Sequence, residues 1–219
     1  MKILLNQSFK AVDLGDINPN TTVLEWLRGN QFVGTKEGCA SGDCGACTAV
    51  VGELASINNK SEIQYKTINT CIALAYSLIG KHLITVEGLS EGTKLHPVQK
   101  AMVIENGSQC GFCTPGFVMS LFAMYHNEKS VNLTKINDAL SGNLCRCTGY
   151  KPIISAAFSA LEKRQQEPSD FYERHQEQFI SSLTELSDDS NISLSYIKDG
   201  KKINFDAPSN LNDLSKIIS

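Results

Sequence analysis

The placement of its cysteines constrains this chain more than any other feature. Eight cysteines fall into two sets of four, with none left over: Cys39, Cys44, Cys47 and Cys71, then Cys110, Cys113, Cys145 and Cys147. The N-terminal residues lack the apolar core and cleavage site of a signal peptide, which indicates a cytoplasmic chain whose thiols stay reduced. Metal ligation therefore explains the cysteines better than a disulfide framework does.

The first set has the spacing C-x4-C-x2-C with a distant fourth cysteine, which is the plant-type [2Fe-2S] pattern. The stretch GCASGDCGACT, residues 38–48, crowds small residues around three of the cysteines. A loop can point several backbone N–H groups at one anionic centre only if it makes tight turns, and glycine permits them. Gly38, Gly42 and Gly45 therefore predict a loop wrapped around a cluster.

Two other uses of the cysteines stay open at this stage. Four thiolates can also hold structural zinc, and buried thiols can act as small apolar side chains. For the second set, the pairs CxxC and CxC do not separate zinc from iron and sulfur by spacing alone. Just after Cys113, Thr114 is expected as the N-cap of a helix and Pro115 as its first residue, and Pro152 opens another helix shortly after Cys147. Two helices are therefore predicted to begin beside this set. Helix N-termini stabilise anionic groups, which favours an iron–sulfur cluster here too.

The remaining pattern predicts an α+β fold in several parts. Residues 1–87 indicate a small domain with an initial strand pair, a helix opened by the capping box Thr22–Glu25, and the strands TAVVGEL, EIQYKT and HLITVEG. A linker is expected at residues 88–97. Apolar residues then recur at helical spacing in four short segments, so residues 88–162 predict a compact helical bundle.

The C-terminal residues differ in composition from both predicted domains. Residues 163–190 are polar and charged and are interpreted as an exposed linker. Residues 191–219 predict a hairpin around Asp199-Gly200, followed by the start of a helix.

Composition excludes several classes of protein. The net charge of -3 and the lack of a basic stripe argue against nucleic-acid binding, and no apolar run approaches a membrane span. The sequence shows no nucleophile, acid–base pair or phosphate loop. The four histidines are expected in ordinary surface or core roles, and Arg146 either balances cluster charge or is solvated. Substrate chemistry is therefore expected on a partner chain, and the isolated chain is not expected to turn over substrate.

Four motifs carry a resemblance to a known family. GTKEGCASGDCGACT, NTCIALA, SQCGFCTPG and NLCRCTGYKPI resemble the iron–sulfur subunit of the molybdenum hydroxylases, most closely bacterial xanthine dehydrogenase small subunits. The resemblance covers residues 1–162, with Ser108 standing where many relatives have glycine. It implies a β-grasp ferredoxin-like domain (1–87) followed by an all-α four-helix-bundle domain (88–162), each holding one [2Fe-2S] cluster.

The resemblance also implies an electron-transfer role. The second cysteine set would lie next to a molybdopterin on a large partner subunit, with Gln109 and Cys147 contacting the pterin. The first set would pass electrons to FAD and then NAD, in an oxidoreductase of purine catabolism. Residues 191–219 resemble the start of a truncated FAD-binding domain, so this chain is not expected to hold FAD alone.

Two alternatives to a xanthine dehydrogenase subunit remain. One is the small subunit of an aldehyde or heteroaromatic hydroxylase of the same superfamily. The other, from a different class, is a zinc-stabilised binding protein without a redox role.

Overall fold

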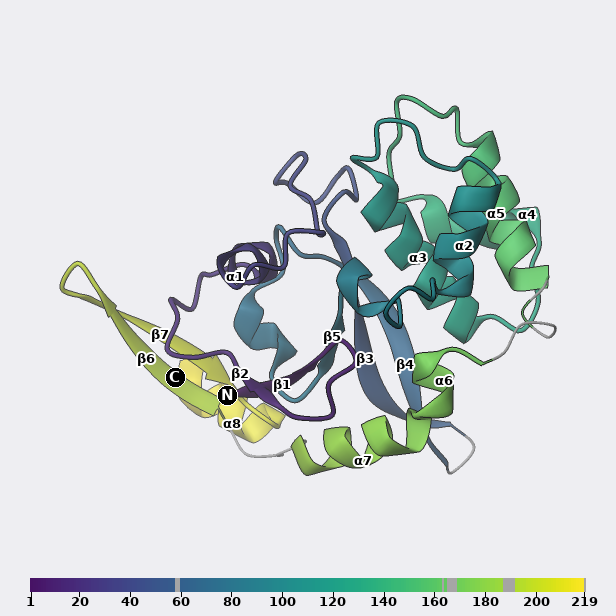
Figure 1. Ribbon diagram of the computed structural model, residues 1–219. Coiled ribbons are helices and arrows are strands. Elements are labelled where there is room, and N and C mark those ends of the chain that lie inside the picture. Colours follow the sequence, from purple (N-terminus) through teal and green to yellow (C-terminus); the bar gives the residue numbers. More distant parts are fainter. Residues whose placement is uncertain (58–59, 163, 165–168, 187–191, 219) are drawn as a thin grey trace.

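The computed structural model describes residues 1–57, 60–162, 164, 169–186 and 192–218. A small β-sheet stands at the centre, with a group of helices packed on one side and a separate hairpin projecting from the other (Figure 1). The fold is thus mixed, with a sheet domain followed by a helical domain, as the sequence predicts. No helix in these residues is long and apolar enough to cross a membrane.

The central sheet has five strands in the order β2-β1-β5-β3-β4. In chain order the strands are β1 (Lys2–Leu5), β2 (Val12–Asp13), β3 (Thr48–Ile57), β4 (Lys60–Asn69) and β5 (His82–Ile84). Only the β1–β5 pair is parallel. The predicted initial hairpin and the three later strands are confirmed.

Both faces are buried at the centre of this sheet, in β1 and β5, whereas one face of β4 is largely exposed. Alternate residues of each strand point to opposite faces, so Ile3 and Leu83 join one core while Leu4 and Ile84 join another. The first face is covered by helix α1 (Val23–Gly29) and the short 3-10 helix η1 (Ala75–Leu78). The predicted capping box opens α1, with Thr22 and Glu25 each bonding the other's backbone, and Trp26 lies in the core.

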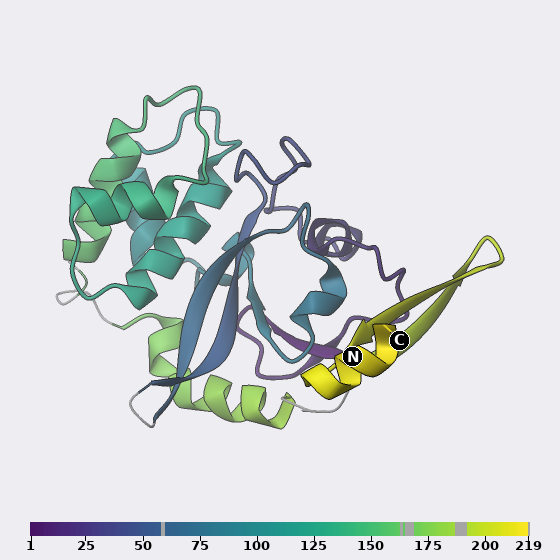
Figure 2. The same cartoon turned by 180° about the vertical axis from the view of Figure 1, so that it is seen from behind.

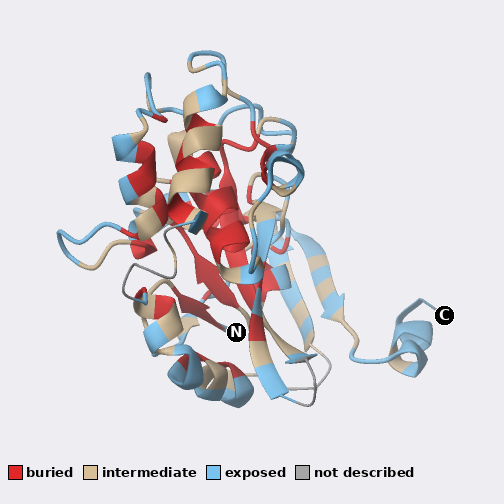
Figure 3. Ribbon diagram, turned by 90° about the vertical axis from the view of Figure 1, so that its right-hand side faces the viewer, coloured by how far each residue is buried: buried red, intermediate tan, exposed pale blue. Residues whose placement is uncertain are grey.

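The second face carries the helical domain. After the short 3-10 helix η2 (Val86–Gly88), its helices are α2 (Pro97–Ile104), α3 (Thr114–Asn127), α4 (Leu133–Leu140) and α5 (Lys151–Glu162). Helix α3 contacts the three other helices and also strands β3 and β4. Its residues 116–125 are all buried (Figure 3). The two domains therefore share one continuous core.

One detail of α3 differs from the prediction. The N-cap is Cys113, not Thr114, and Pro115 is the second helical residue. The Thr114 hydroxyl donates instead to Ser108 Oγ at 2.8 Å. A cysteine of the second set therefore lies directly at the start of the helix.

The expected exposed linker is wrong over much of its length. Helices α6 (Phe171–Arg174) and α7 (Gln176–Leu186) form there and return along the sheet domain (Figures 1 and 2). Tyr172, Phe179 and Leu183 are buried in the shared core. Because charged residues surround these three, the average composition hid an amphipathic pattern. Residues 163, 165–168 and 187–190 of the predicted linker lie outside the described residues.

The predicted C-terminal hairpin is confirmed. Strands β6 (Ile192–Lys198) and β7 (Lys201–Ala207) pair antiparallel, and Asp199 and Gly200 both have positive φ, as a two-residue type I′ turn requires. Helix α8 (Leu211–Ile218) follows and has no buried residue. Phe205 contacts Tyr76, with ring centroids 5.3 Å apart.

Candidate iron–sulfur sites

The loop before β3 surrounds its cysteines with backbone donors. Cys39 Sγ accepts from the N–H groups of Ser41, Asp43 and Cys44 at 3.3 to 3.5 Å, and Cys39 N–H donates to Cys44 Sγ at 3.4 Å. Hydrogen bonds from the Ser41 side chain, and then from backbone N–H groups, lower the pKa of Cys39 to about 6. The loop thus stabilises negative charge on sulfur, as the sequence predicts.

The other two cysteines of this set also lie together. Cys47 Sγ and Cys71 Sγ are 3.3 Å apart. Burial, followed by the neighbouring Cys47 thiol, raises the pKa of Cys71 to about 11. A Cβ added at Gly38 would lie 2.7 Å from Cys44 Sγ, so glycine leaves room for the sulfur at this point.

The second set is assembled from the loop before α3 and the loop before α5. The side chains of Cys113 and Cys145 interact, as do those of Cys110 and Cys147. Burial and the nearby Cys145 raise the pKa of Cys113 to about 12. Burial acts to raise the pKa of Cys145, but hydrogen bonds with Thr148, Cys147 and Cys113 together outweigh it, so the net shift is downward.

Both sets fit a group that contains two metal ions. In each, the sulfurs lie in two pairs, and no three ligand atoms of the described cysteines lie within 4.8 Å of one another. Four thiolates on one zinc ion would bring all the sulfurs to about 3.8 Å from each other, given Zn–S bonds near 2.3 Å. A [2Fe-2S] cluster instead takes two thiolates on each iron.

The two cysteine loops touch each other directly. Leu144 N–H donates to the Cys44 carbonyl at 3.0 Å, which joins a residue of the first set to the neighbour of Cys145 in the second. Beside this bond, buried Asn143 donates through Nδ2 to the Gly45 carbonyl at 3.1 Å. The Asn143 Oδ1 atom accepts from Ser120 Oγ at 2.6 Å. Helix α3 therefore holds the second loop against the first.

Two glycines make this approach possible. A Cβ at Gly45 would lie 2.2 Å from the Gly142 carbonyl oxygen, and a Cβ at Gly116 would lie 2.1 Å from the Gly45 carbonyl oxygen. Gly45 also has φ +69°, which L side chains rarely adopt. Sequence reasoning assigned Gly45 to the loop's own turn and missed Gly116, Ser120 and Asn143, because their partners lie far away along the chain.

Other predicted residues lie near these sites without contacts that define a role. Gln109 and Arg146 are exposed, each beside a cysteine of the second set. The sequence predicted ordinary surface or core roles for the histidines and did not indicate that two of them would come together. His96 and His126 meet Asp170 inside the protein, with their ligand-type atoms within 4.8 Å of one another.

Comparisons with known proteins agree with this geometry. Residues 16–76 match the 2Fe-2S iron–sulfur cluster binding domain family, and residues 85–158 match the [2Fe-2S] binding domain family. Fold and sites thus define a protein with two [2Fe-2S] domains.

Relatives that match about two thirds of this chain include xanthine dehydrogenases and aldehyde oxidases. Xanthine dehydrogenase of Emericella nidulans is 49% identical over 148 residues, which is 68% of this chain and 11% of the relative. Aldehyde oxidase 1 of Bos taurus is 47% identical over 157 residues, which is 71% of this chain and 12% of the relative. The chain therefore spans about a tenth of the length of these curated relatives.

Two solved structures have a fold similar to that of this chain. Quinoline 2-oxidoreductase from Pseudomonas putida 86 superposes with a TM-score of 0.60 and 28% identity, over 77% of this chain and 97% of that one. Aldehyde oxidoreductase from Desulfovibrio gigas gives a TM-score of 0.65 and 26% identity, over 79% of this chain and 18% of that one. The chain belongs to the iron–sulfur part of the molybdenum hydroxylase family, which includes xanthine dehydrogenase and aldehyde oxidase.

Proposed function

We propose that this chain relays single electrons as the iron–sulfur part of a molybdenum hydroxylase. Electrons would enter at the second cysteine set and leave from the first. The cluster in each set supplies one-electron redox chemistry when bound. The chain's own residues hold the thiolates, donate N–H groups to sulfur and keep the two sets in contact.

The proposed ligands and domain boundaries follow the predictions. Cys39, Cys44, Cys47 and Cys71 would hold one [2Fe-2S] cluster, and Cys110, Cys113, Cys145 and Cys147 would hold the other. Residues 1–87 would form a β-grasp ferredoxin-like domain and residues 88–162 a four-helix bundle. The five-stranded sheet and the packing of three helices around α3 support this division.

The contact between Cys44 and Leu144 carries the proposal. Its hydrogen bond at 3.0 Å provides a short path from one cysteine set to the other through backbone atoms. A protein using its cysteines only as structural staples would not need to bring two such sets together. The neighbouring Asn143 is buried, and its side-chain hydrogen bonds to Ser120 and to the Gly45 carbonyl also hold the two cysteine loops together.

The proposed partners lie at the two ends of this path. A molybdopterin-binding large subunit would face the second set, where Gln109 and Cys147 would contact the pterin. An FAD domain or subunit, passing electrons to NAD, would face the first set. Residues 191–219 would open that FAD-binding domain, and the complex would work in the cytoplasm.

The substrate of the complex separates two forms of the proposal. A xanthine dehydrogenase would serve purine catabolism, and the 49% identity to the Emericella nidulans enzyme supports this choice. An aldehyde or heteroaromatic hydroxylase is the second candidate, supported by the similarity to aldehyde oxidase 1 and quinoline 2-oxidoreductase.

The first test is to purify the chain anaerobically and measure its visible spectrum before and after dithionite, with iron and acid-labile sulfide counted. The proposal expects about four irons and four sulfides per chain, because each [2Fe-2S] cluster contains two of each, with colour that bleaches on reduction. Stoichiometric zinc without sulfide after anaerobic reconstitution would contradict it and support the zinc-stabilised binding protein.

A further inference from the structure

The segment after the helical domain connects both domains at the end of the sheet away from the cysteine loops. We propose that residues 170–186, here called the strap, fix the relative position of the two domains and so maintain the contact between the cysteine loops. Asp170, His96 and His126 would fasten the strap. This goes beyond the proposed electron transfer, because it concerns how the chain is held together whether or not clusters are bound.

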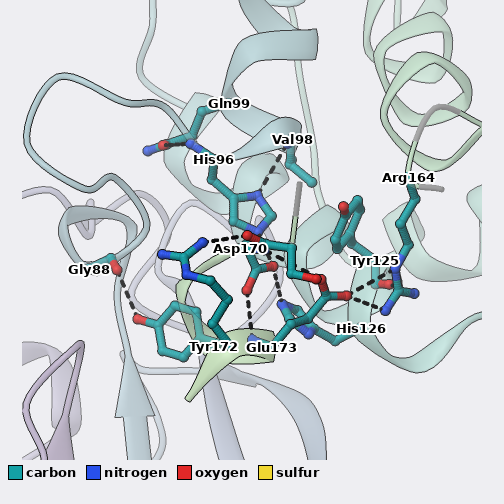
Figure 4. A network of polar contacts seen from close by, with 12 residues as sticks. Gly88, His96, Val98, Gln99, Tyr125, His126, Arg164, Asp170, Tyr172 and Glu173 are labelled. Atoms are coloured by element: carbon teal, nitrogen blue, oxygen red, sulfur yellow. Dashed lines mark hydrogen bonds and ion pairs between the residues drawn. The ribbon is translucent and has the colours of Figure 1, made fainter. Parts of the chain in front are cut away.

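Asp170 lies between two histidines from different elements (Figure 4). His96 Nε2 is 2.9 Å from Asp170 Oδ2, and His126 Nε2 is 3.0 Å from the same oxygen. Asp170 is also the N-cap of α6, where its Oδ1 accepts from Glu173 N–H at 2.9 Å. One buried carboxylate thus joins the strap to the start of α2 and the end of α3.

A metal ion is the main alternative for this group, and the bonding of His96 argues against it. His96 Nδ1 accepts from the N–H of Val98 at 3.2 Å and so caps α2. The single proton of a neutral ring is then on Nε2, where it donates to Asp170. Histidines that bind metals usually donate from their second nitrogen instead. A metal at Nε2 would require either an imidazolate or loss of the cap.

Further contacts hold the strap to the junction between the domains. The Tyr172 hydroxyl donates to the Gly88 carbonyl at 2.8 Å. Arg174 pairs with Glu91. Glu173 accepts from Arg164 at 2.6 Å, and Arg164 donates in turn to the carbonyl of Tyr125 on α3. The strap therefore bonds to the segment that joins the two domains and, through Arg164, to helix α3.

The second half of the strap packs on the sheet domain. Helix α7 contacts β1, β3 and β4. The Phe179 ring lies 4.8 Å from that of Phe9 and 4.5 Å from that of His82, measured between centroids. Phe179 and Tyr172 are both fully buried. Removing the strap would expose these surfaces at a substantial hydrophobic cost.

The position of the strap explains how it would act at a distance. The cysteine loops lie at one end of the junction and the strap crosses the other end, with α3 against the sheet between them (Figures 1 and 2). Fastening at both ends prevents the helical domain from rotating on the sheet. Loosening the strap should therefore weaken the hydrogen bond from Leu144 to Cys44, although both residues lie at the opposite end of the junction from the strap.

The test compares Asp170→Asn with the native chain in its cluster-loaded form. Asparagine is as good an N-cap as aspartate, so helix α6 keeps its cap while the shared charge is removed. We expect hydrogen exchange in the peptide containing Leu144 to speed up about tenfold, as a destabilisation of about 1.4 kcal/mol would cause, with little change in the β3 peptide containing Val50. Asp16→Asn makes the same change at an exposed site and should alter neither peptide.

Three results would overturn the proposal. Unchanged exchange at Leu144 would show that the strap does not position the loops, and an equal increase in both peptides would show only a general loss of stability. If Asp170→Asn does not fold, Tyr172→Phe removes the bond to Gly88 and should give the same selective increase. If the native chain binds one zinc ion and the Asp170→Asn chain does not, His96, His126 and Asp170 form a metal site, and the proposed fastening role is wrong.

Discussion

The two cysteine sets reach similar arrangements by different routes. Three cysteines of the first set lie within the nine residues 39–47, and one loop supplies the N–H donors around them. The second set spans residues 110–147 and forms only when the loops before α3 and α5 come together. The first site is therefore largely a property of local sequence, and the second depends on the packing of the helical domain.

The pKa shifts of the cysteines do not follow this division, because each set contains a thiol shifted in each direction. Hydrogen bonds lower the pKa of Cys39 in the first set and of Cys145 in the second, whereas burial raises the pKa of Cys71 and of Cys113. A buried thiol gives up its proton reluctantly unless a cation arrives. Both sets should therefore need bound metal to deprotonate their most buried cysteine. The comparison can be tested with substitutions that affect one set or the contact between them.

The largest expected effect is the loss of one complete site. Cys147→Ser removes the partner of Cys110 and should abolish or strongly alter the spectroscopic signal of the second set while sparing the first. Cys44→Ser is the matched change and should do the reverse. Low-temperature EPR of the reduced protein measures both. Loss of both signals from a folded Cys147→Ser chain would argue against two separate sites.

A core substitution in the helical domain should weaken the second site before the first. Leu121 on α3 is 1% exposed, and Leu121→Ala should lower the free energy of unfolding by about 3 kcal/mol. Iron at the second set should then be lost at lower denaturant concentration than iron at the first. Leu133→Ala, at a half-exposed position, is the control. If iron is lost from both sites at the same denaturant concentration, the second site does not depend on the helical core more than the first site does.

The contact between the sets can be tested with a matched pair of glycine substitutions. Gly15 and Gly45 have similar positive φ values, but only at Gly45 would a Cβ meet backbone atoms. Gly15→Ala should cost about 1 kcal/mol from strain alone, and Gly45→Ala about 2 kcal/mol more from overpacking. Urea unfolding measures the difference. Equal costs would mean that the loops can separate without loss.

A further prediction concerns the pH dependence of stability. Burial lowers the pKa of His82 to about 4, while its Nε2 bonds to the Asn6 carbonyl at 2.6 Å. Because the unfolded pKa is near 6.5, the stability contributed by neutral His82 is complete above pH 6.5 and is lost as pH falls toward 4, by up to about 3 kcal/mol. His82→Gln should flatten this slope in unfolding free energies measured between pH 7 and 4.5. If the pH dependence of the unfolding free energy is unchanged in His82→Gln, groups other than His82 cause it.

Local signals allowed much of this structure to be predicted from sequence. The Thr22–Glu25 capping box, the Asp199-Gly200 turn and the glycine-rich first loop each act over a few residues. Contacts between distant residues left no such signal. The bonds of Asn143 to Gly45 and of Asp170 to His96 join residues 98 and 74 positions apart. The strap escaped prediction because its three buried apolar side chains stand among charged residues.

The most direct test of two adjoining [2Fe-2S] sites is low-temperature EPR of the fully reduced chain with its spins counted. We expect about two spins per chain, in two distinct signals whose relaxation shows that the centres are close, because each reduced cluster carries one unpaired electron. One spin, or none in a folded chain with metal in both cysteine sets, would contradict this expectation.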